Sequence, residues 1–199
     1  MKKYISFLFV LLALAGTSWA YTRITVSSGN SPKWVKMPIP YSINDRGLSQ
    51  IPNGSEFDAV HRAFQTWQNV STAQVTFEYT GATPQRTLGR DGMNLVTFAD
   101  DATQAVLGSS TIAATFSFFS NSSTVTDEAD IVFSQSLNFS TSGETGKYDI
   151  QGVLTHEIGH LLGLDHSGLV SSVMVPFAAA TQIDQRTLAY DDIAGLSEI

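Results

Sequence analysis

The sequence predicts a single α+β domain, and three observations support this class. The 199 residues are enough for one domain built around one hydrophobic core. An amphipathic helical pattern near residue 55 is followed by several short runs rich in Val, Phe, Ile and Thr. Two further helical patterns close the chain. Strands and helices that are segregated along a chain, rather than alternating, are typical of the α+β class.

The chain begins with the pattern of a secretory signal peptide. Two lysines precede an apolar run at 7–15, and residues 17–20 end in a small-x-small sequence, so we expect cleavage after Ala20. A membrane anchor is the alternative, but the apolar run is short for a span. We therefore divide the chain into a signal peptide (1–20), a polar N-terminal arm (21–34) that we expect to be loosely held, and a domain (35–199). The mature protein is expected to be secreted, outside the cell or in a periplasm, and free of the membrane.

The first two elements of the domain are a strand and a helix. Residues 35–44 predict the strand, and their two prolines favour a strand end or an edge position. Residues 55–70 predict the helix, with Ser55 as its N-cap and Asp58 completing an arrangement like a capping box. Its apolar residues fall at helical spacing. They are Phe57, Val60, Phe64 and Trp67.

Several strands and two helices are expected in the rest of the domain. The strand-like runs are 75–80, 94–99, 111–119 and 129–133. Residues 120–127 predict a turn and 134–148 a polar loop. A second helix is expected to begin with Asp149 as its N-cap, and a last helix to cover about 184–197.

Charge and cysteine content exclude some functions. The net charge of −7 argues against a nucleic-acid partner, because phosphate binding favours a basic patch. The chain has no cysteine, which excludes thiolate metal ligands and a cysteine nucleophile. Any metal ion must be held by His, Asp or Glu. We expect a monomer.

Three of the four histidines lie between residues 156 and 166. His156 and His160 are four apart on a predicted helix, so both rings lie on one face. Gly163 can adopt the left-handed conformation that ends a helix, which lets the chain turn and bring His166 back as a third ligand. Three imidazoles leave zinc an open fourth position, the feature of a catalytic site. His61 lacks ligand partners nearby and is expected to have no metal role.

Glu157 is the candidate general base. It follows the first histidine, so its carboxylate can reach a water on the metal without being a ligand. The same group can pass the proton to the departing amine. A His-Glu-x-x-His sequence also occurs by chance in ordinary helices, but the glycine and third histidine at fixed spacing make that alternative weak.

These residues resemble the signature of the metzincin metalloproteases, His-Glu-x-x-His-x-x-Gly-x-x-His followed by a methionine turn. The turn is present at 172–176, with Met174 and Pro176. Within metzincins the chain is similar to matrixins of bacterial type, because Ser167 follows the third histidine and 188–196 resembles the last matrixin helix. Two further segments, 129–133 and 59–67, extend the resemblance over nearly all of 35–196.

The resemblance implies a zincin-like fold. Its features are a twisted five-stranded mixed sheet with an antiparallel edge strand, an active-site helix and a C-terminal helix. A peptide would lie extended along the edge strand by strand addition, and 111–119 is the candidate strand. Residues 175–182 would wall the main specificity pocket. Phe177 is the favoured contributor, and plain core packing is its alternative.

The resemblance also assigns supporting roles. Met174 would lie beneath the zinc, Asp191 could hold the mature N-terminus and Asp192 would support the methionine turn. A second, structural zinc is not expected, because no histidine lies between His61 and His156. Latency through a propeptide cysteine is excluded by the absence of cysteine. Calcium could bind four acidic residues, although no loop motif supports it and a solvated acidic surface is the favoured interpretation. They are Asp127, Glu128, Asp130 and Glu144.

The favoured function is therefore a secreted zinc endopeptidase that hydrolyses internal bonds of extended protein or peptide substrates. It would hold one catalytic zinc ion on His156, His160 and His166. Two alternatives stay open. One is a zinc-bound binding or adhesion module with little turnover, because a fold does not determine function. The other is a zinc hydrolase that acts on non-protein amides.

Overall fold

The computed structural model describes residues 20–119 and 124–199. The predicted signal peptide lies outside the described residues except for Ala20, and so does part of the predicted turn at 120–127. Among the described residues, no helix combines the length and apolar character that a membrane crossing requires.

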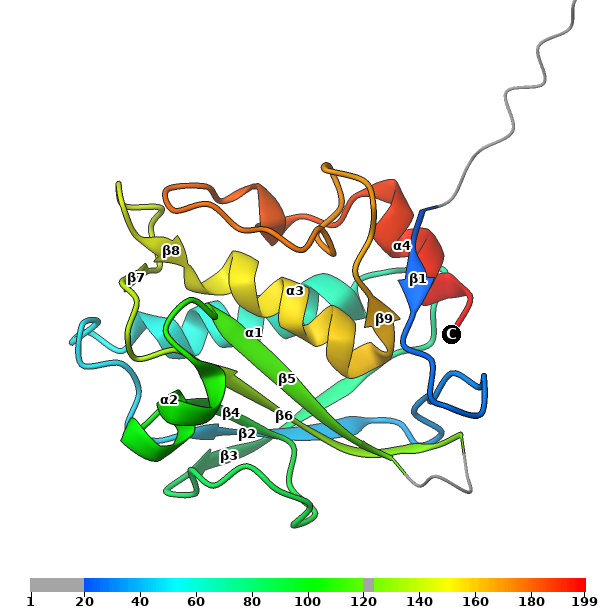
Figure 1. Cartoon of the computed structure of the whole chain (residues 1–199), viewed down its shortest axis with the longest axis horizontal. Helices are drawn as coiled ribbons and strands as arrows, with labels where there is room; N and C mark the ends of the chain where they lie inside the picture. Colours follow the sequence, from blue (N-terminus) through cyan, green and yellow to red (C-terminus); the bar gives the residue numbers. More distant parts are fainter. Residues whose placement is uncertain (1–19, 120–123) are drawn as a thin grey trace, which may run out of the picture.

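A five-stranded mixed sheet lies on one side of the domain (Figure 1). One of its two outer strands runs antiparallel to its neighbour, whereas the other neighbouring pairs are parallel. In spatial order the strands are β3 (Phe77–Thr83), β2 (Ile39–Asn44), β4 (Leu95–Phe98), β6 (Thr126–Phe133) and β5 (Ala113–Phe119). The α+β class and the antiparallel edge strand are thus confirmed.

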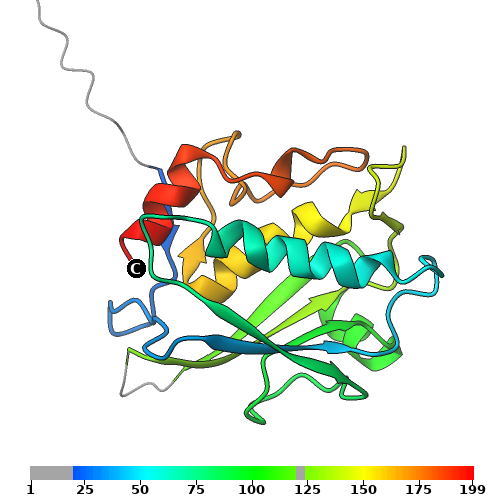
Figure 2. The ribbon, with the colours of Figure 1, turned by 180° about the vertical axis from the view of Figure 1, so that it is seen from behind.

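Two long helices cover one face of this sheet. α1 (Ser55–Gln68) and α3 (Ile150–Leu162) lie side by side above the strands, as Figures 1 and 2 show from opposite sides. The core fills the space between them and the sheet, where Trp67 of α1, Ile158 of α3 and Phe133 of β6 are fully buried. The side of α3 that carries Glu157 meets the edge strand β5.

The predicted cap of α1 is wrong. Gly54 is the N-cap, in the left-handed region at φ 71°, and the Asn53 amide oxygen accepts the Ser55 N–H at 3.2 Å. The Ser55 hydroxyl instead bonds the Thr141 hydroxyl at 2.7 Å. Glycine tolerates a positive φ, so the turn into the helix is made one residue earlier than the capping pattern predicts.

The last helix is shorter than predicted. Residues 184–197 divide into the 3₁₀ helix η1 (Asp184–Arg186) and α4 (Tyr190–Ser197), separated by extended backbone at Thr187 and Ala189. The Ala189 N–H donates to the Asp192 carboxylate at 2.8 Å, so α4 begins where that acidic side chain can cap it.

Several short elements were not predicted. α2 (Asp101–Leu107) begins after Asp100, whose carboxylate accepts the Thr103 N–H at 2.9 Å. The expected polar loop before α3 contains a parallel pair of two-residue strands, β7 (Phe139–Ser140) and β8 (Tyr148–Asp149). Such short elements carry too few residues to show a hydrophobic period.

The N-terminal arm is packed against the domain, so the expectation that it is loosely held is wrong. β1 (Thr22–Arg23) pairs antiparallel with β9 (Leu164–Asp165), just beyond α3. Further along the arm, the Trp34 indole N–H donates to the Leu161 carbonyl at 2.7 Å. These contacts place the arm at the C-terminal end of the active-site helix.

Candidate active site

Helix α3 has a well-defined start and end. The Asp149 carboxylate accepts the Gly152 N–H at 2.8 Å, which confirms the predicted N-cap. At the other end, Gly163 has a φ of 104°, and its N–H donates to the His160 carbonyl at 3.0 Å. Buried side chains such as Leu154 and Ile158 anchor the helix in the core. The histidines are therefore presented from a rigid element.

The structure brings the three predicted histidines together. One ring nitrogen of each residue lies within 4.8 Å of those of the other two. The Nε2 atoms of His156 and His160 are 3.1 Å apart, and the ring centroid of His166 is 5.3 Å and 4.8 Å from those of His156 and His160. Zinc–imidazole bonds are about 2.0–2.1 Å long, so these spacings fit three donors around one small ion.

The hydrogen bonds of two rings assign their tautomers. His156 Nδ1 lies 2.7 Å from the Val173 carbonyl oxygen, and His160 Nδ1 lies 2.8 Å from that of Leu164. A carbonyl only accepts, so each neutral ring carries its hydrogen on Nδ1. Neither Nε2 then has a hydrogen to donate, and the 3.1 Å contact between them sets two lone pairs against each other. A cation between the rings would remove that repulsion, so the donor set fits zinc.

Burial keeps two of the rings in the neutral form that binds metal. It lowers the pKa of His156 and of His160 below the ordinary value. The remaining histidines of the cluster add to this fall because like charges repel. His166 differs in being exposed, and its backbone N–H donates to the Asp165 carboxylate at 2.7 Å.

Glu157 is buried beside the histidine cluster. Its Oε2 accepts a hydrogen bond from the Thr115 hydroxyl on β5 at 2.6 Å. Burial raises the pKa of the Glu157 carboxyl, while His160 and the Thr115 hydrogen bond oppose that rise. Helix α3 and strand β5 therefore meet at the candidate general base.

Met174 packs directly against the active-site helix. It is buried, and a β-carbon built on Gly159 would overlap its sulfur atom and lie 3.1 Å from the Trp67 ring. Only glycine leaves the thioether room under the turn of α3 that separates His156 from His160. Position 159, a variable position of the signature, is therefore restricted by Met174 and Trp67.

The Asp192 side chain stabilises the methionine turn by accepting hydrogen bonds from the backbone of the turn. Its carboxylate accepts the N–H groups of Val173 at 2.9 Å and Met174 at 3.2 Å, together with the Ser172 hydroxyl. The same Val173 offers its carbonyl to His156. One buried carboxylate on α4 is thus linked through the turn to a candidate metal ligand.

Asp191 joins the N-terminal arm to the third histidine. Its Oδ1 accepts the backbone N–H groups of Ala20 at 2.9 Å and Tyr21 at 3.1 Å. Its Oδ2 accepts the hydroxyl of Ser167, the residue after His166, at 2.7 Å. The start of the arm and the loop that carries His166 therefore share one buried carboxylate.

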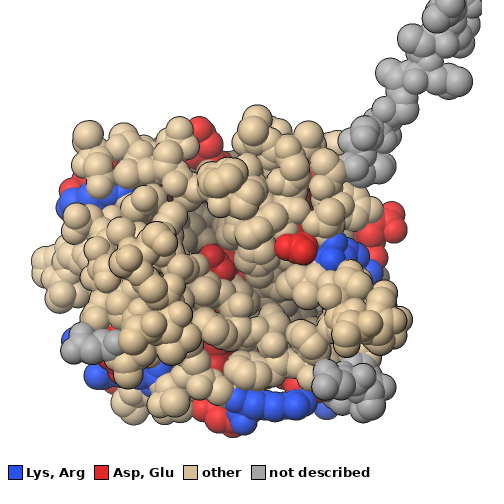
Figure 3. Space-filling model, viewed as in Figure 1, with Lys and Arg blue, Asp and Glu red and all other residues tan. Residues whose placement is uncertain are grey.

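A cleft of about 390 Å³ opens over the histidine cluster. Its walls are the edge strand with the residues before it, the face of α3, and the chain after the methionine turn. Phe177 lines it and is 78% exposed, so core packing does not explain this side chain. Figure 3 shows the hollow on this face, bordered mainly by uncharged residues.

Comparison with known proteins identifies the family. The family profile described as Matrixin matches residues 33–199. The chain belongs to the matrixin family.

Several curated relatives are similar to this matrixin. Metalloendoproteinase 2-MMP of Arabidopsis thaliana is 30% identical over 186 residues, which cover 89% of this chain and 45% of that protein. Matrix metalloproteinase-16 of Homo sapiens is 26% identical over 170 residues, covering 84% and 27%. Matrilysin of Rattus norvegicus is 42% identical over 59 residues, covering 30% and 22%. The chain spans less than half the length of each.

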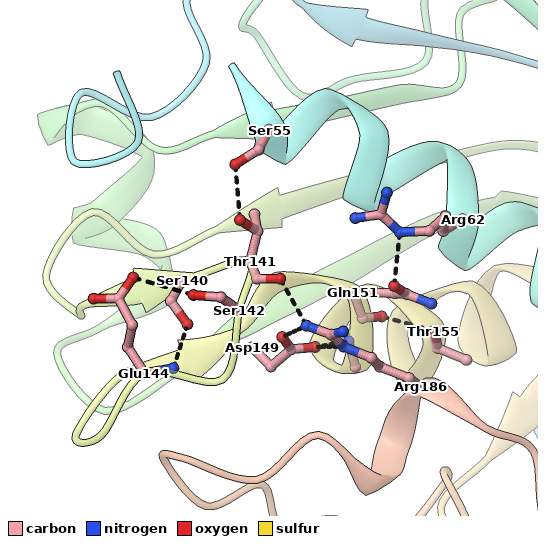
Figure 4. A network of polar contacts seen from close by, with 11 residues as sticks. Ser55, Arg62, Ser140, Thr141, Ser142, Glu144, Asp149, Gln151, Thr155 and Arg186 are labelled. Atoms are coloured by element: carbon pink, nitrogen blue, oxygen red, sulfur yellow. Dashed lines mark hydrogen bonds and ion pairs between the residues drawn. The ribbon is translucent and has the colours of Figure 1, made fainter. Parts of the chain in front are cut away.

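An ion pair in this matrixin links the wall of the cleft to the start of α3. Arg186 of η1 donates from Nε to Asp149 at 2.9 Å and from Nη2 to both Asp149 and the Thr141 carbonyl (Figure 4). The neighbouring Gln185 lines the cleft and donates to the Val173 carbonyl at 3.2 Å. The segment after the methionine turn is therefore anchored at its far end as well.

The acidic residues considered for calcium are engaged with the protein. Two of them, Glu128 and Asp130, are buried and accept backbone N–H groups of the loop 89–95, so a solvated surface is wrong for this pair. Burial raises the pKa of Asp130 to about 6. Asp127 pairs with Arg90, and Glu144 pairs with Lys147 at 2.6 Å.

The histidine outside the signature lies apart from the cluster. His61 Nδ1 lies 2.7 Å from the Tyr41 hydroxyl, and its ring meets the edge of Tyr79. Burial lowers the pKa of His61. The metal group found among the described residues comprises the three signature histidines.

Thr115 and Gln185 are cleft residues that the sequence patterns did not indicate. Both line the cleft and bond to groups that the motif does identify. A signal for Thr115 was present, because it lies inside the run predicted as the edge strand, next to the active-site helix. No comparable signal marked Gln185.

Proposed function

We propose that this matrixin is a secreted, zinc-dependent endopeptidase that hydrolyses internal peptide bonds of extended polypeptides. His156, His160 and His166 would hold the zinc, and Glu157 would act as general base. The proposal rests on the 3.1 Å distance between the Nε2 atoms of His156 and His160, whose lone pairs face each other beside the buried Glu157 carboxylate. The cleft beside an antiparallel edge strand supports the substrate class, since such an edge can accept an extended chain.

Different residues of the chain would have separate roles in peptide-bond hydrolysis. When bound, zinc would polarise the scissile carbonyl and bring the pKa of a coordinated water to about 7. Glu157 would accept the proton of that water on its carboxylate and later donate it to the nitrogen of the departing amine. The carbonyls of Val173 and Leu164 keep two imidazoles in the tautomer whose Nε2 is free. The methionine turn holds the first of these carbonyls in place.

Binding of the substrate would rely on strand β5 and the opposite wall. Free backbone groups on the outer edge of β5 would pair with an extended peptide, because among the described strands β5 has a neighbour on one side only. The apolar Phe177 and neighbouring wall residues would receive a side chain of the substrate. Secretion rests on the signal pattern of residues 1–20.

The test is cleavage of an unfolded protein by the zinc-loaded mature chain. We expect Glu157→Ala to reduce kcat/KM by about 10²- to 10⁴-fold, the range for loss of a general base, and a zinc chelator to abolish turnover. Glu78→Ala, at an exposed position on β3, is the matched control and should cleave like the wild type. Zinc content and melting temperature should be equal in all three proteins. Undiminished cleavage by Glu157→Ala would reject the mechanism.

A further inference from the structure

A hydroxyl on the edge strand contacts the candidate general base. Thr115 Oγ1 lies 2.6 Å from Glu157 Oε2 and 2.9 Å from the Glu157 carbonyl oxygen. Thr115 is in the middle of β5, paired with Ile131 of β6, and it lines the cleft. Nothing in the zinc signature requires a hydroxyl at this place on the sheet.

We propose that Thr115 is a positioning residue that orients the Glu157 carboxylate for catalysis. The inference rests on the proposed function, in which Glu157 is the general base. Thr115 would act through Glu157 and would not touch the reacting atoms itself. It adds a member to the site that lies 42 residues from Glu157 in the sequence.

The geometry gives the hydroxyl control over one oxygen of the carboxylate. Among the described residues, Thr115 is the hydrogen-bond donor found for the Glu157 side chain. A glutamate side chain has several rotatable bonds, and a partner at 2.6 Å selects one orientation among them. Thr115 and Glu157 both line the cleft, so the carboxylate is held beside the space that a water would occupy. Preorganisation of this kind lowers the cost of reaching the transition state.

The same contact ties the edge strand to the active-site helix. A purely structural role would be to join β5 and α3, and its loss would then affect stability and substrate binding rather than the catalytic step. A positioning role predicts that the catalytic step slows while stability and substrate binding stay unchanged. The two roles are therefore separated by comparing kcat with KM and with the melting temperature.

The deciding variants are Thr115→Val and Thr115→Ser. Valine keeps the β-branched shape that suits a strand and loses the hydroxyl, whereas serine keeps the hydroxyl. Thr97→Val is the matched control, because Thr97 lies buried on β4 and its hydroxyl has no hydrogen-bond partner in the described structure. Each protein is assayed with zinc loaded, for kcat, KM, zinc content and melting temperature.

We expect Thr115→Val to reduce kcat by about 10- to 100-fold, the effect of losing one hydrogen bond to a charged group. Its KM, zinc content and melting temperature should stay close to those of the wild type. Thr115→Ser should recover most of kcat, and Thr97→Val should match the wild type. A crystal structure of zinc-loaded Thr115→Val should show the Glu157 carboxylate turned from its wild-type orientation.

The outcomes that overturn this inference differ from those that overturn the proposed function. If Glu157→Ala is inactive but Thr115→Val keeps wild-type kcat, the positioning role is wrong and the general base stands. If Thr115→Ser is as slow as Thr115→Val, the hydroxyl is not the cause, and the inference is again wrong. If Glu157→Ala cleaves like the wild type, the proposed function itself fails. Should Thr115→Val not fold, Thr115→Ala is compared with Thr115→Ser by the same criteria.

Discussion

The active-site helix α3 and the segment that follows it, residues 164–189, both contribute to the cleft, but they are held in different ways. Most side chains of α3 are buried, and its apolar face packs on α1 and the sheet. The segment after it has little regular structure and exposes large apolar side chains, Phe177 among them. Besides the buried Met174 it has polar fixed points, since the carboxylates of Asp191, Asp192 and Asp149 bind it at three places.

This difference separates two ways of building one site. Hydrophobic burial is non-directional and tolerates small shifts, so it can position a helix but does not fix the backbone conformation of a loop. Hydrogen bonds to a buried carboxylate are directional, and each one fixes a particular backbone group. The contrast predicts effects on the free energy of unfolding that decrease from Asp192 to Gly159 and then to Phe177.

Loss of the Asp192 carboxylate should have the largest effect. Asp192→Ala removes the acceptor of three donors, the Ser172 hydroxyl, the buried Val173 N–H and the part-buried Ala189 N–H, whereas the Met174 N–H keeps the Ser172 oxygen at 2.9 Å. We expect the free energy of unfolding to fall by about 3–5 kcal/mol, at about 1–3 kcal/mol for each group partly relieved by water. Zinc affinity should fall too, because Val173 also holds His156. Urea unfolding and chelator competition measure the two effects.

The control for Asp192 is an aspartate within the segment that Asp192 anchors. Asp184 is exposed at the start of η1, and Asp184→Ala should change stability by no more than about 0.5 kcal/mol. If Asp192→Ala were as stable as this control, carboxylate anchoring of the segment would be wrong.

The packing of Met174 against Gly159 predicts that alanine at position 159 has the opposite effect on stability to that in an ordinary helix. In an ordinary helix interior, replacing glycine by alanine stabilises by up to about 1 kcal/mol. Gly159→Ala should instead destabilise by about 2 kcal/mol, because the new β-carbon overlaps the Met174 sulfur. Thermal or urea unfolding gives the sign directly.

A double variant checks the cause of that inversion. Gly159→Ala combined with Met174→Ala should be more stable than the sum of the single effects by at least about 1 kcal/mol, because the overlap is removed. Strict additivity, or a stabilising Gly159→Ala, would show that the methionine does not restrict position 159.

Phe177 should have the smallest effect on stability and a clear effect on activity. Because its side chain is 78% exposed, Phe177→Ala should change the free energy of unfolding by less than about 0.5 kcal/mol. On peptides with a large apolar residue at the cleft wall, kcat/KM should fall by about tenfold, since apolar contacts in a pocket contribute on this scale. Val170→Ala removes a 91% exposed side chain of the same segment and should leave both quantities unchanged. Equal loss of activity in both variants would show that Phe177 has no specific role in substrate binding.

Much of the helix and sheet framework could be predicted from local patterns. Residues 55–70 and the stretch after Asp149 show helical spacing, and the structure has α1 and α3 there. The mixed sheet with its antiparallel edge strand followed from the family resemblance rather than from the strand runs alone. The same patterns failed at Gly54, at the break before α4 and at the short helix α2, where a few residues decide the outcome.

Two of the polar contacts had no signal in local patterns or in the family resemblance, because each joins residues far apart in the chain. Arg186 and Asp149 are 37 residues apart, and Thr115 and Glu157 are 42 apart. Composition alone suggested a solvated acidic surface, but Glu128 and Asp130 proved to be buried supports of a loop. Whether a carboxylate faces water or a backbone N–H depends on which segment the fold places over it.

The sequence by itself determined the spacing of the three histidines, the acidic residue beside the first, the helix that carries them and the glycine that ends it. These features follow from the periodicity of a helix and the conformational freedom of one residue, which act over a few positions. Tertiary structure alone decided which carbonyls select the imidazole tautomers, which hydroxyl meets Glu157 and which carboxylate pairs with Arg186. Those choices depend on distances between segments that are remote in sequence, and only the packed core brings such segments within hydrogen-bonding range.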